Sequence, residues 1–427
     1  MMNPHVSHRL SLMAKLFIVI IFITVFEGAF RKWGSNLFTY PLVGLRDVLA
    51  LIGICYGLAN GYARRMPQLT IVIGLLSFMV FLWGLIQVLI NELSPLIYLI
   101  GLRFWLLYLC FATLAACALT VHEFRVIVRC LIMLLLAMTP LVVFQHFQPP
   151  GSFWNKQVDE SVVFTVAGDV VRTTGIFSFT AGYTAFMGLV TPLVLLTMDS
   201  RYQIWRKAWM SWLCVAALLI CTIVSGSRGA IIFTGLMLLL QAVLIMSFGS
   251  GKDRFRALGS IVLIGVITLL LLLIFSRAVD ATLERFELAS QSESLADRLA
   301  YNFLPQGEQS VFGAGLGMGS NVAAQFMGYG DTFLLAETEN ARVILELGAL
   351  GWIVLLVKLI GISLALYFGA RLARRKRRGG VMLLWLSCGL ALLSWSIVGQ
   401  LTINALGYLL LGLALLALRL EREGQLQ

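Results

Sequence analysis

The feature that most constrains this chain is a succession of apolar stretches, each long enough to cross a bilayer. A spanning helix needs about 20 such residues, and about twelve stretches qualify. They cover residues 12–31, 41–62, 69–91, 96–120, 124–146, 176–198, 208–226, 229–248, 257–276, 341–369, 380–398 and 400–418. With 59% hydrophobic and 12% charged residues, the composition lies outside the range of soluble chains. We predict an all-α polytopic membrane protein, with residues 1–427 forming one integral membrane domain.

The distribution of Lys and Arg predicts the orientation in the bilayer, because short cytoplasmic loops carry an excess of basic residues. Alternate loops and both tails hold most of them, with the densest run, "RLARRKRR", at 371–378. An even number of spans then places both termini in the cytoplasm. The first apolar run has no small-residue cleavage site after it, so we expect it to remain as a span. Because this topology explains most of the +11 net charge, we exclude nucleic acid as a partner and keep the lipid bilayer.

Two non-cytoplasmic loops are long, residues 147–175 and 277–340. Loops of about 60 residues are usually functional rather than simple connections. The second opens with a helical pattern of apolar and charged residues, for which we expect one or two helices on the membrane surface. Its run "FGAGLGMGSN" reads as a flexible turn, and its spacing does not match a dinucleotide-binding motif. We expect the 277–340 loop to act as a lid.

Cysteine and histidine give no sign of a metal or redox site. All seven cysteines fall inside apolar spans, where they behave as small hydrophobic residues. The four histidines are scattered without metal-ligand spacing. We therefore predict no metal site and no cofactor.

Charges on the external side are not explained by the basic-loop rule. Arg172 lies in "GDVVRTTGIFS", Arg228 lies in the short turn "SGSRGA", and Arg342 lies at the head of the tenth span. Glu339, Arg342 and Glu346 share one helical face. Guanidinium groups bind phosphate with two parallel hydrogen bonds, so this set suits a phosphate-linked substrate. Each of these charges also has a purely structural interpretation. The three arginines could extend from the ends of the spans to the membrane–water interface. Glu339, Arg342 and Glu346 could form a helical ion-pair network that contributes about 0.2 to 0.5 kcal/mol per pair.

Other charges lie within or beside the first four spans. Glu27 and Arg31 are four residues apart on one helix, and Arg46 is adjacent to Asp47, so we expect these four to pair structurally. Arg103 lies on the outer third of the fourth span, where it could reach an external cavity together with Arg172, Arg228 and Arg342. Arg31 and Arg103 are kept as further possible site residues.

In this order, "RTTGIFSFTAGYTAFMGL", "SGSRGA", "FGAGLGMGS" and "TENARVILELGALG" resemble the O-antigen ligase and Wzy-type polysaccharide polymerase superfamily. "FEGAFRKW" and "LRD" near the N-terminus are similar to its exopolysaccharide members. The resemblance implies an inverting, metal-independent glycosyltransferase of the GT-C type. Such an enzyme takes a glycan from undecaprenyl pyrophosphate at the periplasmic face of the bacterial inner membrane.

Applied to this chain, the resemblance implies that Arg172 and Arg228 bind the pyrophosphate of the donor. The ligases have a His-Asn pair where this sequence has Glu339-Asn340, so Glu339 becomes the candidate general base. Arg342 would hold that carboxylate or add to the phosphate cluster, and Glu346 would orient Arg342. Two other external groups could accept a proton, Glu337 and His146.

The sequence therefore predicts a polymerase of lipid-linked oligosaccharide repeat units that makes an exopolysaccharide or O-antigen-type polymer. Chain-length regulators and export proteins are its expected partners. The first alternative is a ligase that moves finished glycan to a lipid or protein acceptor. A transporter or flippase for lipid-linked sugars is the alternative of another class, and a scaffold in polysaccharide assembly is a third.

Overall fold

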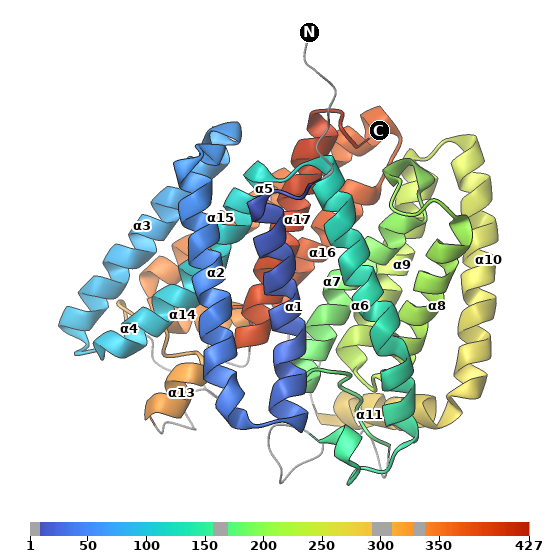
Figure 1. The fold of residues 1–427 in the computed structure, drawn as a ribbon, viewed down its shortest axis with the longest axis horizontal. Helices are drawn as coiled ribbons and strands as arrows, with labels where there is room; N and C mark the ends of the chain where they lie inside the picture. Colours follow the sequence, from blue (N-terminus) through green and yellow to red (C-terminus); the bar gives the residue numbers. More distant parts are fainter. Residues whose placement is uncertain (1–8, 157–169, 293–309, 328–337, 427) are drawn as a thin grey trace.

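The structure is a computed structural model that describes residues 9–156, 170–292, 310–327 and 338–426. Its regular elements are helices, and most of them run side by side as a bundle (Figure 1). The beginning of the first helix, α1 (Leu12–Trp33), and the end of the last, α17 (Leu401–Arg422), lie at the same end of that bundle, which we call the end of the termini. This arrangement confirms the prediction of an all-helical polytopic membrane protein.

Ten helical segments in the described ranges are long and apolar enough to cross a membrane. Two shorter apolar helices, α8 (Ala208–Val224) and α16 (Gly380–Ser394), occupy the other two predicted spans. The count by length is thus ten rather than about twelve, because α8 has 17 residues and α16 has 15, which is short for a spanning helix. The ten are α1 (Leu12–Trp33), α2 (Thr39–Ala59), α3 (Pro67–Ile90), Pro95–Ala118, α6 (Val121–Phe147), α7 (Thr180–Thr197), α9 (Arg228–Phe248), α10 (Gly251–Ile274), α15 (Ala349–Lys376) and α17 (Leu401–Arg422).

Local sequence explains several helix starts. Ser11 caps α1, and Thr120 with Glu123 forms a capping box at the start of α6. Ser250 and Asp253 do the same for α10. The Glu123 carboxylate also accepts the Ser11 N–H at 2.8 Å, so one acidic side chain joins the beginnings of α1 and α6.

The core of the bundle is formed by α17 and α7, whose apolar windows are 89% and 83% buried. In contrast, α3 and α10 are peripheral, at 11% and 6%. A Cβ at Gly412 of α17 would lie 3.1 Å from Ala112, so a small residue lets α17 approach the neighbouring chain closely. The last spanning helix is therefore the most enclosed one.

One predicted span contains a π-helical turn, and the connection between the last two spans is irregular. The segment Pro95–Ala118 consists of α4 (Pro95–Leu102), a π-helical turn η3 (Arg103–Leu107) and α5 (Tyr108–Ala118). Between α16 and α17, residues 395–400 are irregular. Asn404 joins the two breaks, because its amide donates to Phe104 O at 2.7 Å and to Ile397 O at 2.9 Å. Irregular backbone within a membrane protein needs such internal partners.

The predicted span 341–369 is wrong as a single helix. It consists of α14 (Glu339–Leu347) and α15, separated by Gly348 with φ of 57°. A Cβ at Gly348 would overlap Val311 O, so only glycine fits this turn. The acidic and basic residues of α14 therefore belong to a short helix outside the spans.

Within its described residues, the predicted external loop 277–340 contains α11 (Ser276–Ser292), α13 (Asn321–Met327) and the first residues of α14. In Figure 1, α11 runs across the end of the bundle opposite the termini. This confirms the expected helix at the start of the loop. Residues 293–309 and 328–337 lie outside the described ranges. Single-turn elements complete the fold: η1 (Asn36–Phe38), η2 (Tyr62–Arg65), η4 (Phe153–Asn155) and η5 (Ser200–Tyr202).

Candidate functional site

A cavity of about 630 Å³ lies between α1, α13, the segment before α7 and the beginning of α17. These elements meet at the end of the bundle opposite the termini (Figure 1). Among the described residues that line the cavity, Arg31 is the one cationic side chain. The other polar side chains are neutral and can hydrogen-bond to the hydroxyl groups of a sugar. Its polar and aromatic lining consists of Arg31, Phe177, Ser178, Phe179, Asn321, Gln325, Gln400 and Thr402.

The cavity wall at residues 174–178 is fixed by contacts with α1 and α6. A Cβ at Gly28 would lie 2.6 Å from Ser178 N, so α1 packs directly on this backbone. The buried Lys32 ammonium donates to Thr174 Oγ1 at 2.7 Å and to Gly175 O at 3.2 Å. Sequence reasoning missed Lys32, whose only signal was a lysine next to Arg31 at the end of an apolar run.

The two arginine motifs predicted to bind pyrophosphate meet in space. Thr173 Oγ1 donates to Val224 O at 3.2 Å, which brings the residue after Arg172 to the turn that precedes Arg228. Ser227 caps α9, and its hydroxyl lies 3.1 Å from Thr184 Oγ1. Arg172 and Arg228 are both half-buried. Phe177–Phe179, just before α7, line the cavity, and Thr184 lies in the first turns of α7. Because Thr184 contacts Ser227, both arginine motifs lie at the same end of the molecule as the cavity.

Of the two possible site arginines, only Arg31 is among the residues described as lining this cavity. Arg103 instead donates to both carboxylate oxygens of Asp47, at 2.7 Å and 3.0 Å. The Tyr108 hydroxyl donates to the same carboxylate at 2.8 Å. The expectation that Arg103 reaches the cavity is therefore not supported, because an interhelical ion pair holds its guanidinium.

The expected pairing of Glu27 with Arg31 is also replaced by an interhelical contact. Glu27 accepts from Arg46 at 2.8 Å, and both side chains are almost fully buried. The other carboxylate oxygen of Glu27 accepts from Thr402 Oγ1 at 2.9 Å. Arg46 and Asp47 do approach each other, at 3.9 Å. A charged network thus runs from α2 through α1 to Thr402 in the cavity wall.

The three charged residues of α14 are all buried. Arg342 donates to the Ser396 hydroxyl, and the Glu339 carboxylate accepts the Val398 N–H at 3.2 Å and 3.3 Å. Asn340 donates to Leu393 O at 3.1 Å. These contacts hold the irregular segment 395–400 against α14, and Gln400 at its end lines the cavity.

Glu346 holds a different segment. Its carboxylate accepts from Trp105 Nε1 at 2.7 Å and from the Gly319 N–H at 2.8 Å. The glycine-rich run 312–320 is therefore anchored, and the prediction of a flexible turn is wrong. Gln87 adds a second anchor, because its side-chain oxygen accepts the Leu316 N–H at 2.9 Å.

Arg342 lies between these two segments. A Cβ at Gly399 would overlap its guanidinium, and a Cβ at Gly319 would lie 2.5 Å from its Cγ. Glycine at both positions lets the backbone of each segment contact the arginine. Because Val398 and Gly399 separate α14 from Gln400, the charged face of α14 lies behind the cavity wall.

Burial changes the protonation of the α14 carboxylates, which lie outside the spanning helices. It raises the pKa of Glu346 to about 7. It also raises the pKa of Glu339, against the opposing charges of Lys358 and Arg342. Both groups thus take up a proton more readily than an exposed glutamate.

The remaining predicted residues lie elsewhere. His146, in the last turn of α6, packs its ring 5.7 Å from that of Phe275 and is not among the residues that line the cavity. Glu337 lies outside the described residues. Within the described part of the chain there is no group of three or more His, Cys, Asp or Glu side chains that could hold a metal ion.

The fold and the site together define a polytopic helical membrane protein with a polar cavity at one end of its bundle. No protein-family model and no curated protein matches this chain.

Proposed function

We propose that this protein is a GT-C-type glycosyltransferase that polymerises undecaprenyl-pyrophosphate-linked oligosaccharide repeat units at the periplasmic face of the bacterial inner membrane. The product would be an exopolysaccharide or an O-antigen-type polymer. The observation that carries the proposal is the cavity at the end of the bundle opposite the termini. Arg31 lines it among neutral hydrogen-bonding side chains. The Arg172 and Arg228 motifs contact each other at the same end of the molecule.

The proposed reaction is a displacement at the anomeric carbon of the donor sugar. A hydroxyl oxygen of the acceptor forms a bond to that carbon as the bond to the pyrophosphate oxygen breaks. The electron pair leaves with undecaprenyl pyrophosphate, and the configuration inverts. Arg31, Arg172 and Arg228 would stabilise the negative charge that develops on the leaving group. Ser178, Asn321 and Gln400 offer hydrogen bonds to the sugar hydroxyls.

The attacking hydroxyl must lose its proton, and Glu339 is the proposed acceptor. Its raised pKa suits a general base. In the described conformation its carboxylate accepts the Val398 N–H, so proton transfer needs a bridging water or a small shift of residues 398–400. Arg342, held at Ser396, would keep that segment in place beside the carboxylate.

A transporter or flippase for lipid-linked sugars is the second candidate function. The π-helical turn η3 interrupts the spanning segment Pro95–Ala118, and Asn404 joins it to the irregular connection 395–400. Interrupted helices are typical of substrate sites in secondary transporters.

The experiment that tests these functions uses the purified chain in proteoliposomes supplied with a synthetic lipid-linked repeat unit. A polymerase makes products of two or more repeats still attached to the lipid carrier. A ligase places glycan on a separate lipid or protein acceptor. A flippase moves the substrate between leaflets without forming a glycosidic bond, and that result would overturn the enzyme proposal.

A further inference from the structure

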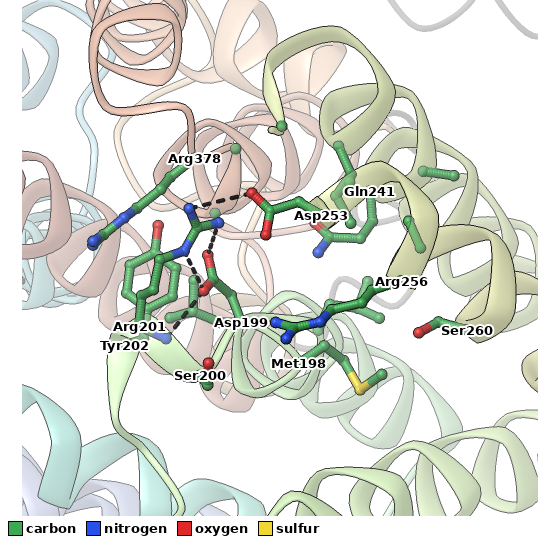
Figure 2. A pocket seen from close by; sticks show the side chains of 18 of the residues that line it. Met198, Asp199, Ser200, Arg201, Tyr202, Gln241, Asp253, Arg256, Ser260 and Arg378 are labelled. Carbon is green, nitrogen blue, oxygen red and sulfur yellow. Dashed lines mark hydrogen bonds and ion pairs between the residues drawn. The ribbon is translucent and has the colours of Figure 1, made fainter. Parts of the chain in front are cut away.

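A second cavity, of about 190 Å³, is shown in Figure 2. It lies where α9 is joined to α10, at the other end of the bundle (Figure 1). Its walls come from the end of α7, η5, α9, the first turns of α10 and the turn between α15 and α16. Four arginines line it: Arg201, Arg256, Arg377 and Arg378. It shares no lining residue with the cavity that contains Arg31.

Both carboxylates in this cavity interact with one arginine. Arg201 donates to the two oxygens of Asp199 at 2.7 Å and 2.8 Å, and its guanidinium lies 3.5 Å from Asp253 (Figure 2). Arg201 therefore joins η5 to α10. Within the described part of the chain, Arg256 and Arg377 have no carboxylate within ion-pair distance, so the lining carries an excess of positive charge.

Two polar groups in the lining lack hydrogen-bond partners among the described residues, the Tyr202 hydroxyl and the Gln241 side-chain oxygen. Tyr202 is only 1% exposed, and its hydroxyl faces Gly380, another lining residue. A buried hydroxyl without a partner is costly, and a hydrogen bond to a bound phosphate or to a water in the cavity would remove that cost. A hydroxyl can donate to a phosphate oxygen, while the Gln241 oxygen requires a donor such as a hydroxyl.

The cavity wall below the arginines is apolar. Leu195, Leu238, Ile245 and Ile264 line it, together with Ile261, which is 44% exposed on the outside of α10. The cavity therefore continues into a surface that faces the acyl chains. A ligand that fits has a phosphate, a hydroxyl-bearing group and a hydrocarbon tail.

We propose that this cavity binds the headgroup of an anionic glycerophospholipid from the leaflet at this end of the bundle. The phosphate lies between Arg256 and the Tyr202 hydroxyl, the headgroup hydroxyl reaches Gln241, and the acyl chains lie along Ile261. Basic pockets between spanning helices on the cytoplasmic side are known to hold such headgroups. The bound lipid attaches the peripheral α10 to η5 and to the α15–α16 turn. This site is independent of the proposed transferase activity.

The test measures lipid retained by the purified full-length chain, with native mass spectrometry across a titration of phosphatidylglycerol. Phosphatidylcholine is the zwitterionic comparison, and inorganic phosphate is the soluble competitor. Arg256→Gln should weaken phosphatidylglycerol binding about tenfold, since it removes one charge-assisted hydrogen bond. Tyr202→Phe should weaken it several-fold without loss of folding, because the hydroxyl it removes has no partner in the described protein.

Arg371→Gln is the matched control, because Arg371 is an exposed arginine of α15 that does not line the cavity. Its binding should equal that of the unaltered protein. Equal affinity in all three variants would overturn the site. Displacement of the lipid by millimolar inorganic phosphate would also overturn the proposal, because the ligand would then be a soluble phosphate anion.

Discussion

At the scale of single residues, the protein uses buried charge to hold irregular backbone. Glu339 and Arg342 hold residues 395–400, and Glu346 holds the glycine-rich run. The sequence predicted that these three residues share one helical face, and the structure shows that all three are buried. It could not predict their partners, because Ser396, Val398 and Trp105 come from distant elements.

The base assignment predicts the effect of Glu339→Gln. Glutamine keeps the size of the side chain and still accepts the Val398 N–H, but it cannot take a proton. Turnover should fall by about 10² to 10⁴ while donor binding survives. Single-turnover transfer from a lipid-linked repeat measures both. Near-normal transfer would assign Glu339 to positioning alone.

The buried carboxylate of Glu346 should make the stability of the fold, and not the rate of the transfer reaction, depend on pH. Its pKa of about 7 in the folded protein lies above the ordinary glutamate value of 4.5, so the folded protein binds the additional proton between these values. Its contribution to stability is therefore complete below about pH 4.5 and is lost as the pH rises through 7. Glu346→Gln, which resembles the protonated form, should flatten the melting temperature between pH 5 and 7.5. The exposed Glu284 gives the control, because Glu284→Gln should leave the wild-type slope unchanged.

The phosphate-binding role of Arg172 and Arg228 predicts that either alanine variant abolishes polymer in cells at unchanged protein level. Lysine should restore little activity, because it lacks the two-pronged geometry of a guanidinium. Polymer length on gels, with immunoblots for protein level, gives the readout. Arg371→Ala, at the other end of the molecule, should have no effect. Full activity in both site variants would remove the two arginines from the mechanism.

At the scale of elements, hydropathy predicted where spans occur but not where they break. The π-helical turn is held by Asn404 from a distant helix, so no local sequence signal marks it. Segment 395–400 differs, because hydropathy already separated the predicted spans 380–398 and 400–418 there. Partners from other helices also explain the charge pairs. A contact within one helix between Glu27 and Arg31 was expected, yet Arg46 from α2 pairs with Glu27, because a buried carboxylate requires a close hydrogen-bonded cation and the neighbouring helix supplies one.

Gly399 tests whether segment 395–400 is fixed against α14. Gly399→Ala places a methyl group on the Arg342 guanidinium, so it should destabilise the fold by about 1 to 3 kcal/mol. Gly44→Ala in α2 is the matched control, because nothing lies within 4 Å of a Cβ at that position. The control should be neutral or stabilising by up to about 1 kcal/mol. Equal melting temperatures for the two variants would show that the segment adjusts freely.

At the scale of the whole molecule, composition alone predicted the class, since an apolar chain of this length has few alternatives to a helical bundle in a bilayer. The cavity that contains Arg31 was not predicted, because four elements from separate parts of the sequence enclose it. The placement of Arg172, Arg228 and α14 at one end agrees with the alternation of basic loops. Sidedness itself remains a prediction.

Sidedness predicts opposite labelling of two introduced cysteines. Val311 is 67% exposed next to the glycine-rich run, and Lys252 is exposed at the start of α10. In intact cells, Val311→Cys should react with a membrane-impermeant thiol reagent, whereas Lys252→Cys should react only after lysis of the inner membrane. The reverse pattern would invert the topology and place the Arg31 cavity in the cytoplasm.

The burial of α17 has a consequence for biogenesis. Helices leave the ribosome in order, so α17, the most enclosed of the described spanning helices, enters the bilayer after the others that the structure describes. Until then the Glu27 carboxylate lacks Thr402, and the Phe104 carbonyl lacks Asn404. Until α17 has been translated and inserted, the polar groups of the earlier helices that it satisfies therefore face lipid or insertion factors without a partner. A ribosome that stalls before that point leaves a chain whose exposed polar groups mark it for membrane proteases.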